Sequence, residues 1–118
     1  MVKRLSAEYG LPSIDRMDSG KEYGYEYIGY DGPKATAEDK IASFIKALEK
    51  VEPGKTYVFI DHPAYNDSEM ETVMHVGYED VAVDRQGVTD LLKSPEVAAA
   101  IKAKGIKLMT FKELFEKK

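Results

Sequence analysis

The stretch from Thr56 to Asp67 limits what this chain can fold into more than any other part of the sequence. It begins with β-branched and aromatic residues, which favour a buried strand, and it turns polar at Asp61 and His62. In α/β proteins, ligands and catalytic groups collect at the carboxyl ends of buried strands. We therefore predict a strand over about 56–61 whose end forms one wall of an active site.

The segments around this strand predict an α/β fold. The clearest helix spans 37–50, with Thr36 as N-cap and Asp39 completing a capping box. Its apolar positions are spaced to form one stripe, made of Ile41, Phe44, Ile45 and Leu48. Further elements are expected as helices at 1–9, 68–75, 84–93, 95–104 and 110–118 and as short strands at 11–14 and 106–109. Because helices alternate with strands, we expect a short, mostly parallel sheet flanked by helices.

Several details of these elements follow from cap and face patterns. Gly10 and Gly105 are placed to end helices in the left-handed conformation. Ser94 and Pro95 form an N-cap and first-turn pair, and Thr110 forms a capping box with Glu113. For the helix that Asp84 is expected to cap, the inward residues are predicted to be Val88, Leu91 and Leu92.

The tyrosine-rich, glycine-spaced segment 23–30 admits two interpretations. It is either an extended hairpin arm or loop whose tyrosines cover a core edge, or an aromatic platform for sugar rings. An aromatic face suits the apolar face of a pyranose.

Composition excludes several classes of protein. A chain of 118 residues has the size of one domain, and a net charge of -4 without a basic run argues against a nucleic-acid partner. It has no cysteine, so disulfides, thiolate nucleophiles and zinc-thiolate sites are excluded. No apolar run approaches the ~20 residues of a membrane span, and the first residues carry charges where a signal peptide needs an apolar core. We expect a soluble unit whose sequence does not indicate a compartment.

His62 is the first candidate for chemistry. Pro63 restricts the preceding residue to an extended conformation, which would hold the imidazole in one direction. A histidine held in this way suits proton transfer near neutral pH. The alternative is a histidine that only ends a strand and bonds a loop carbonyl.

Metal ligands of suitable types are present, but their spacing is unspecific. His62, His75, Asp61 and Asp67 match no compact ligand motif. The sequence also lacks a nucleophile elbow and a phosphate-binding glycine loop.

Three other residues are candidate substrate contacts. Arg85 could clamp a carboxylate, or it could anchor a helix start through an ion pair. Tyr65 and Tyr78 are candidate sugar contacts, and both could equally be structural.

The second half of the chain carries a family resemblance. A proline-glycine turn, a strand and His-Pro within 51–64 are followed by Gly77-Tyr78, by Asp84-Arg85, and by the segments 91–97 and 104–114. In this order they resemble the C-terminal portion of the YdjC/ChbG-like carbohydrate deacetylases. Residues 1–12 also look like an internal helix and strand start of that family.

The resemblance implies a fold and a chemistry. Such enzymes resemble polysaccharide deacetylases and have distorted (β/α) barrels, so residues 1–118 would form a single, partial barrel-like unit. They hold a divalent metal, zinc or magnesium, through an aspartate and two histidines of their N-terminal half. The metal activates water, an aspartate acts as base, and a histidine protonates the leaving amine. Only His62 matches a catalytic position, as general acid or substrate contact, and Arg85 matches a supporting arginine.

Three functions remain open at this point. The chain could be the C-terminal portion of a metal-dependent N-deacetylase of amino sugars, inactive alone because the metal ligands and base are missing. It could be a non-catalytic module for carbohydrate binding or subunit association. It could also be a small hydrolase with its own metal site at His62 and His75. An opened sheet exposes an edge, so we expect a homo-oligomer or pairing with a missing N-terminal half.

Overall fold

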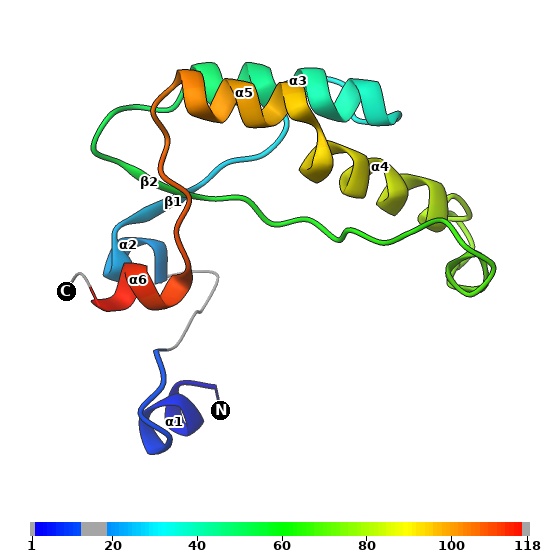
Figure 1. Ribbon diagram of the computed structural model, residues 1–118. Coiled ribbons are helices and arrows are strands. Elements are labelled where there is room, and N and C mark those ends of the chain that lie inside the picture. Colours follow the sequence, from blue (N-terminus) through cyan, green and yellow to red (C-terminus); the bar gives the residue numbers. More distant parts are fainter. Residues whose placement is uncertain (1, 13–18, 117–118) are drawn as a thin grey trace. The chain divides into compact units, whose positions relative to one another are not determined.

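The computed structural model describes residues 2–12 and 19–116, which combine helices with a short parallel sheet (Figure 1). The elements follow in the order α1 (Val2–Glu8), α2 (Ser19–Tyr23), β1 (Tyr25–Tyr27), α3 (Ala37–Glu49), β2 (Thr56–Val58), the 3-10 helix η1 (Met70–Thr72), α4 (Val81–Lys93), α5 (Pro95–Ala103) and α6 (Phe111–Glu116). Two compact units divide the chain. The first unit comprises Met1–Ile28, Glu52–Val58 and Lys107–Lys118, and the second comprises Gly29–Val51 and Phe59–Ile106.

The first unit contains the sheet. β1 and β2 run parallel, with Tyr25 opposite Thr56 and Tyr27 opposite Val58. The predicted parallel sheet is therefore confirmed. A hairpin arm at 23–30 is wrong, because β1 pairs with a strand about thirty residues further along the chain. Tyr25 is buried, and its ring meets that of Tyr27 edge to face with centroids 5.5 Å apart.

The helix ends of the first unit follow the sequence pattern. Gly10, with φ of 63°, follows α1 in the left-handed conformation that was expected. Thr110 and Glu113 form the predicted capping box of α6, with Thr110 N–H donating to Glu113 Oε2 at 2.7 Å. The strand expected at 106–109 is wrong, since no ladder forms there. Leu11 and Pro12 are also outside any strand, and the rest of the strand expected at 11–14 lies outside the described residues.

The second unit is built from α3, α4 and α5, with α5 alongside α3 (Figure 1). Apolar side chains from all three helices are buried there, namely Phe44, Ala47, Leu48, Val81, Ala82, Val88, Leu91 and Val97. The predicted capping box of α3 is confirmed, because Thr36 Oγ1 accepts from Asp39 N–H at 3.1 Å. The Ser94 N-cap and Pro95 at the first turn of α5 are confirmed as well.

The buried face of α3 starts one residue earlier than the apolar stripe suggests. Its fully buried residues are Lys40, Ser43, Phe44, Ala47 and Leu48, whereas Ile41 and Ile45 are only partly buried. Residues spaced by three or four share one face of a helix, so both 40, 44 and 48 and the predicted 41, 45 and 48 could form a buried face. The difference is that a lysine takes the first core position, which a hydrophobicity pattern does not predict.

α4 begins at Val81, so the predicted start at Asp84 is wrong. Asp80 is the N-cap, and Asp84 lies within the first turns. Val81, the first residue of the helix, is buried. Leu91 is 0% exposed and Leu92 is 55% exposed, so the expectation that both point inward is wrong for Leu92. Successive residues lie about 100° apart around a helix.

β2 ends at Val58, three residues before Asp61, so the predicted strand over 56–61 is too long. The ladder stops because β1 ends at Tyr27 and offers no partner beyond Ile28, whose N–H donates to Val58 O at 3.0 Å. Phe59 belongs to the second unit, where its ring packs against Phe44 with centroids 4.7 Å apart.

Two smaller elements complete the comparison. The short helix expected at 68–75 is the single 3-10 turn η1. The residues after it form a turn that leads into α4, with one isolated bridge between His75 and Tyr78. Among the helices of the described ranges, none has the length and apolar character needed to cross a membrane.

Neighbouring leucines of α4 give a direct test of this packing. We expect Leu91→Ala to lower the free energy of unfolding by about 2–5 kcal/mol, because it leaves a cavity in the core. Leu92→Ala, at an exposed position of the same helix, should change it by less than about 0.5 kcal/mol. Urea unfolding of both variants checks this, and equal effects would contradict the assigned face of α4.

Candidate functional site

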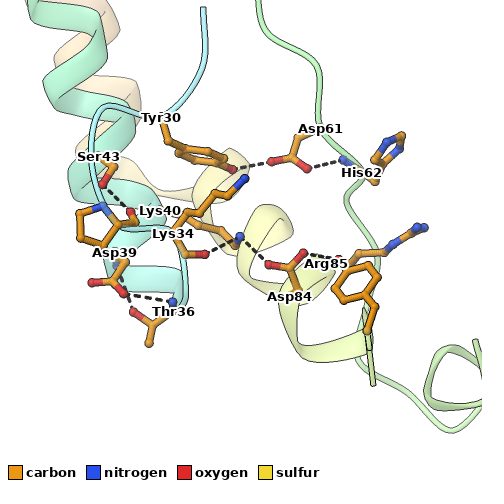
Figure 2. A network of polar contacts seen from close by, with 12 residues as sticks. Tyr30, Lys34, Thr36, Asp39, Lys40, Ser43, Asp61, His62, Asp84 and Arg85 are labelled. Carbon is orange, nitrogen blue, oxygen red and sulfur yellow. Dashed lines mark hydrogen bonds and ion pairs between the residues drawn. The ribbon is translucent and has the colours of Figure 1, made fainter. Parts of the chain in front are cut away.

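His62 lies in an extended segment that is held by side chains instead of a sheet. Tyr30 Oη donates to Asp61 Oδ2 at 2.6 Å, and Asp61 Oδ1 accepts from the backbone N–H of His62 at 2.8 Å (Figure 2). His62 itself is exposed. The carboxylate of Asp61 therefore joins the turn before α3 to the backbone of the candidate proton donor.

The residues after His62 are tied to α4. Ala64 N–H donates to Arg85 O at 3.2 Å, and Thr89 Oγ1 donates to Ala64 O at 2.9 Å. Asn66 N–H donates to the side-chain oxygen of Gln86 at 2.8 Å. Each of these backbone groups would otherwise need water. Together with the Asp61 contacts, they fix the segment 61–66 along one side of the second unit.

A buried lysine lies beside this segment. Lys40, on α3, is 2% exposed, and its Nζ lies 2.6 Å from Asp84 Oδ1 on α4 and 2.8 Å from Lys34 O. Its ammonium also lies 5.4 Å from the centroid of the Tyr30 ring, a cation–π distance. A buried ammonium is stable only when its hydrogen bonds are satisfied, and these contacts satisfy it.

Gly87 makes room for the lysine. A Cβ at position 87 would lie 3.1 Å from Cε of Lys40, closer than ordinary packing allows. The aliphatic part of the Lys40 side chain therefore packs against α4 at Gly87, which has no side chain.

Asp84 is shared between two donors. Lys40 Nζ occupies its Oδ1 (Figure 2). Tyr78 Oη donates to its Oδ2. Partial burial opposes ionisation, but the hydrogen bonds from Lys40 and Tyr78 outweigh it and hold the pKa of Asp84 below its ordinary value. The same hydrogen bond raises the pKa of Tyr78. Asp84 is thus an anion and Tyr78 a donor near neutral pH.

Tyr30 also remains protonated. Burial, and then the hydrogen bond to Asp61, raise the pKa of its hydroxyl well above the ordinary value. It therefore stays a hydrogen-bond donor to Asp61 throughout the neutral and moderately alkaline range.

The four residues selected from the sequence all lie in the second unit. Tyr78 and Arg85 flank the Asp84 contacts, and the Arg85 side chain extends to the same side of the network as His62 (Figure 2). Tyr65 is 61% exposed, with Lys93 Nζ 5.5 Å from its ring centroid. Tyr78 is only partly exposed, and its hydroxyl is engaged with Asp84.

The candidate metal ligands are not gathered into one cluster in the described part of the chain. Over the described ranges, no three histidine, aspartate or glutamate side chains come together closely enough to hold one. His75 sits in its own turn, with Nδ1 3.0 Å from Val76 O and its ring edge against Tyr78. Asp61 and Asp67 are each engaged with nearby backbone N–H groups, those of His62 and Met70 respectively.

Sequence reasoning missed Lys40, Tyr30 and the role of Asp61. Lys40 carried one usable signal, since it stands four residues before Phe44 at the start of the core-facing series 40, 43, 44, 47 and 48. Tyr30 carried none, because its partner Asp61 is 31 residues away.

Comparison with known proteins does not identify a family or a function for this chain. No protein-family model matches the sequence, and no curated protein matches it either. The resemblance to the YdjC/ChbG-like deacetylases therefore stays a prediction from the motifs and their order.

The Lys40–Asp84 pair can be tested by removing one partner. We expect Lys40→Met to lower the free energy of unfolding by about 1–3 kcal/mol, because it leaves the Asp84 carboxylate without its ammonium. Lys46→Met is the matched control, since Lys46 is exposed and lies 4.0 Å from Asp31. It should change stability by less than about 1 kcal/mol. Equal effects in denaturant unfolding would contradict a structural role for Lys40.

The lowered pKa of Asp84 predicts a pH dependence. A carboxyl whose pKa is lower in the folded state stabilises the fold above its unfolded pKa, about 3.9, and loses this contribution as the pH falls through its folded pKa. The stability difference between the natural protein and Asp84→Asn should thus be largest at pH 5–7 and narrow below about pH 4. Urea unfolding at several pH values measures it, and a difference that is constant down to pH 3 would refute the ion pair.

Proposed function

We propose that this chain is the C-terminal portion of a metal-dependent carbohydrate N-deacetylase related to the YdjC/ChbG-like enzymes, a partial (β/α)-barrel unit that forms the proton-donating wall of the active site. The observation that supports it best is the fixed segment 61–66. It presents His62 at the surface while its backbone is hydrogen-bonded through Asp61, Ala64 and Asn66.

The chemistry assigned to His62 is the last proton transfer of amide hydrolysis. When the tetrahedral intermediate breaks down, the C–N bond cleaves and its electron pair goes to nitrogen. The His62 imidazolium gives that nitrogen a proton, so a neutral amine leaves and acetate remains. A positioned general acid contributes about 10²–10⁴-fold to such a step. The proposal assigns activation of the attacking water to groups outside this chain, as the family resemblance implies.

The neighbouring side chains have binding roles in this proposal. Tyr65 offers an exposed ring three residues after His62 for the apolar face of a sugar. Arg85 supplies a positive charge on the same side as His62 (Figure 2). Tyr78 supports the site through Asp84 more than through the substrate, because its hydroxyl is already engaged.

A non-catalytic carbohydrate-binding module is the second candidate. It is favoured by the exposed Tyr65 ring, which Lys93 flanks. Such a module would bind N-acetylated chitooligosaccharides through Tyr65 without needing His62. The two functions differ in which substitution matters.

Acetate release from N,N′-diacetylchitobiose tests the proposal in an assembly of this protein with the groups that activate the water, because the chain alone supplies only the proton donor. We expect His62→Ala to lower turnover by about 10²–10⁴-fold with little loss of stability, since its side chain is exposed. His75→Ala, in a turn of the same unit, is the matched control and should leave turnover unchanged.

Other results would overturn the proposal. Unchanged turnover in His62→Ala would make His62 structural. Sugar binding that is lost in Tyr65→Ala, without acetate release by the natural protein, would favour the binding module instead.

A further inference from the structure

His62 lies where the sheet no longer holds the chain. β2 ends at Val58, so no strand ladder reaches Asp61 or His62. An unrestrained residue samples many backbone conformations, and fixing it costs entropy. A proton donor acts efficiently only when its direction is fixed relative to the reacting atom. The direction of His62 must therefore come from contacts other than the sheet.

The carboxylate of Asp61 provides these contacts with both of its oxygens. Oδ1 accepts from the backbone N–H of His62 at 2.8 Å, and Oδ2 accepts from Tyr30 Oη at 2.6 Å (Figure 2). Hydrogen bonds to an ionised acceptor are shorter and stronger than neutral ones. Pro63 adds a restriction on the other side of His62 by disfavouring helical backbone angles there.

Tyr30 is itself held on two sides. Its ring meets Phe59 edge to face, with centroids 5.5 Å apart, and the Lys40 ammonium lies 5.4 Å from its centroid. Lys40 in turn is fixed by Asp84. These contacts link the buried ion pair between α3 and α4 to the backbone of His62, and the raised pKa of Tyr30 keeps its donor proton in place.

We infer that Tyr30, acting through Asp61, is the positioning residue that fixes the backbone of His62 and so directs its imidazole. The catalytic use of that direction rests on the proposed function. The positioning itself rests only on the contacts among these three residues.

Tyr30→Phe tests the inference because it removes the hydroxyl and keeps the ring. We expect the backbone amide of His62 to exchange with solvent about 3- to 10-fold faster, measured by ¹⁵N-edited NMR, because the anchoring of Asp61 is lost. We also expect kcat for acetate release to fall about tenfold while KM stays within about twofold, since direction affects the transition state more than binding.

Tyr57→Phe is the matched control. Its hydroxyl is likewise engaged in a hydrogen bond, which it accepts from Glu52 N–H at 3.2 Å, but it lies in the first unit. The His62 amide, kcat and KM should all stay unchanged in this variant.

A graded pair at position 61 gives an independent test, also if Tyr30→Phe folds poorly. Asp61→Asn keeps one oxygen that can accept one of the two hydrogen bonds, whereas Asp61→Ala keeps neither. Exchange at the His62 amide should therefore be fastest in Asp61→Ala, intermediate in Asp61→Asn and slowest in the natural protein.

An unchanged His62 amide in Tyr30→Phe and in Asp61→Ala would overturn the positioning role. So would a fall in kcat with a normal His62 amide, since Tyr30 would then act by another route. If the natural protein releases no acetate even when the water-activating groups are supplied, the proposed function is overturned instead, and the His62 amide alone then decides whether Tyr30 positions it.

Discussion

The buried ammonium of Lys40 is the constraint on which the second unit depends. A cation with 2% exposure requires acceptors on every side, and it obtains them from Asp84 on α4 and from the backbone carbonyl of Lys34. The pair links α4 to α3, and the absence of a side chain at Gly87 leaves room for the lysine, since a Cβ there would lie 3.1 Å from Lys40 Cε. Buried ion pairs stabilise less than apolar packing of the same volume, but they select one arrangement over others. In this unit the ion pair joins α3 to α4 at Lys40 and Asp84.

The candidate site is connected to this ion pair through a chain of side-chain contacts. Tyr30 lies against the same ammonium, and it connects through Asp61 to the backbone of His62. At one end of the network stands the exposed residue His62, and at the other end stands the buried ammonium of Lys40, which is packed in the core between α3 and α4. An arrangement of this kind suits a side chain that must be exposed to substrate while keeping one direction.

The sequence predicted what depends on neighbouring residues. The capping boxes at Thr36 and Thr110 and the Ser94-Pro95 helix start are local patterns, and all of them are present. The parallel pairing was also expected from the alternation of elements. The length of β2 was not predictable, because its apolar run continues to Ile60 whereas the ladder ends with its partner strand.

The candidate site was predictable only in its exposed residues. His62 stood out through its own neighbours, but Tyr30 and Asp84 act through partners 31 and 44 residues away. A hydrophobicity pattern treats any lysine as solvent-facing, so the burial of Lys40 on the core face of α3 was not predicted. Contacts of this kind become visible only when the helices are placed against each other.

The division of the chain has a consequence for how such a protein can be dissected or recombined. The second unit is made of Gly29–Val51 and Phe59–Ile106, with Glu52–Val58 of the first unit between them. The backbone therefore passes between the units four times, and no single cut yields either one as an uninterrupted polypeptide. Neither unit could be transplanted by one crossover between genes, so the two are expected to be inherited together.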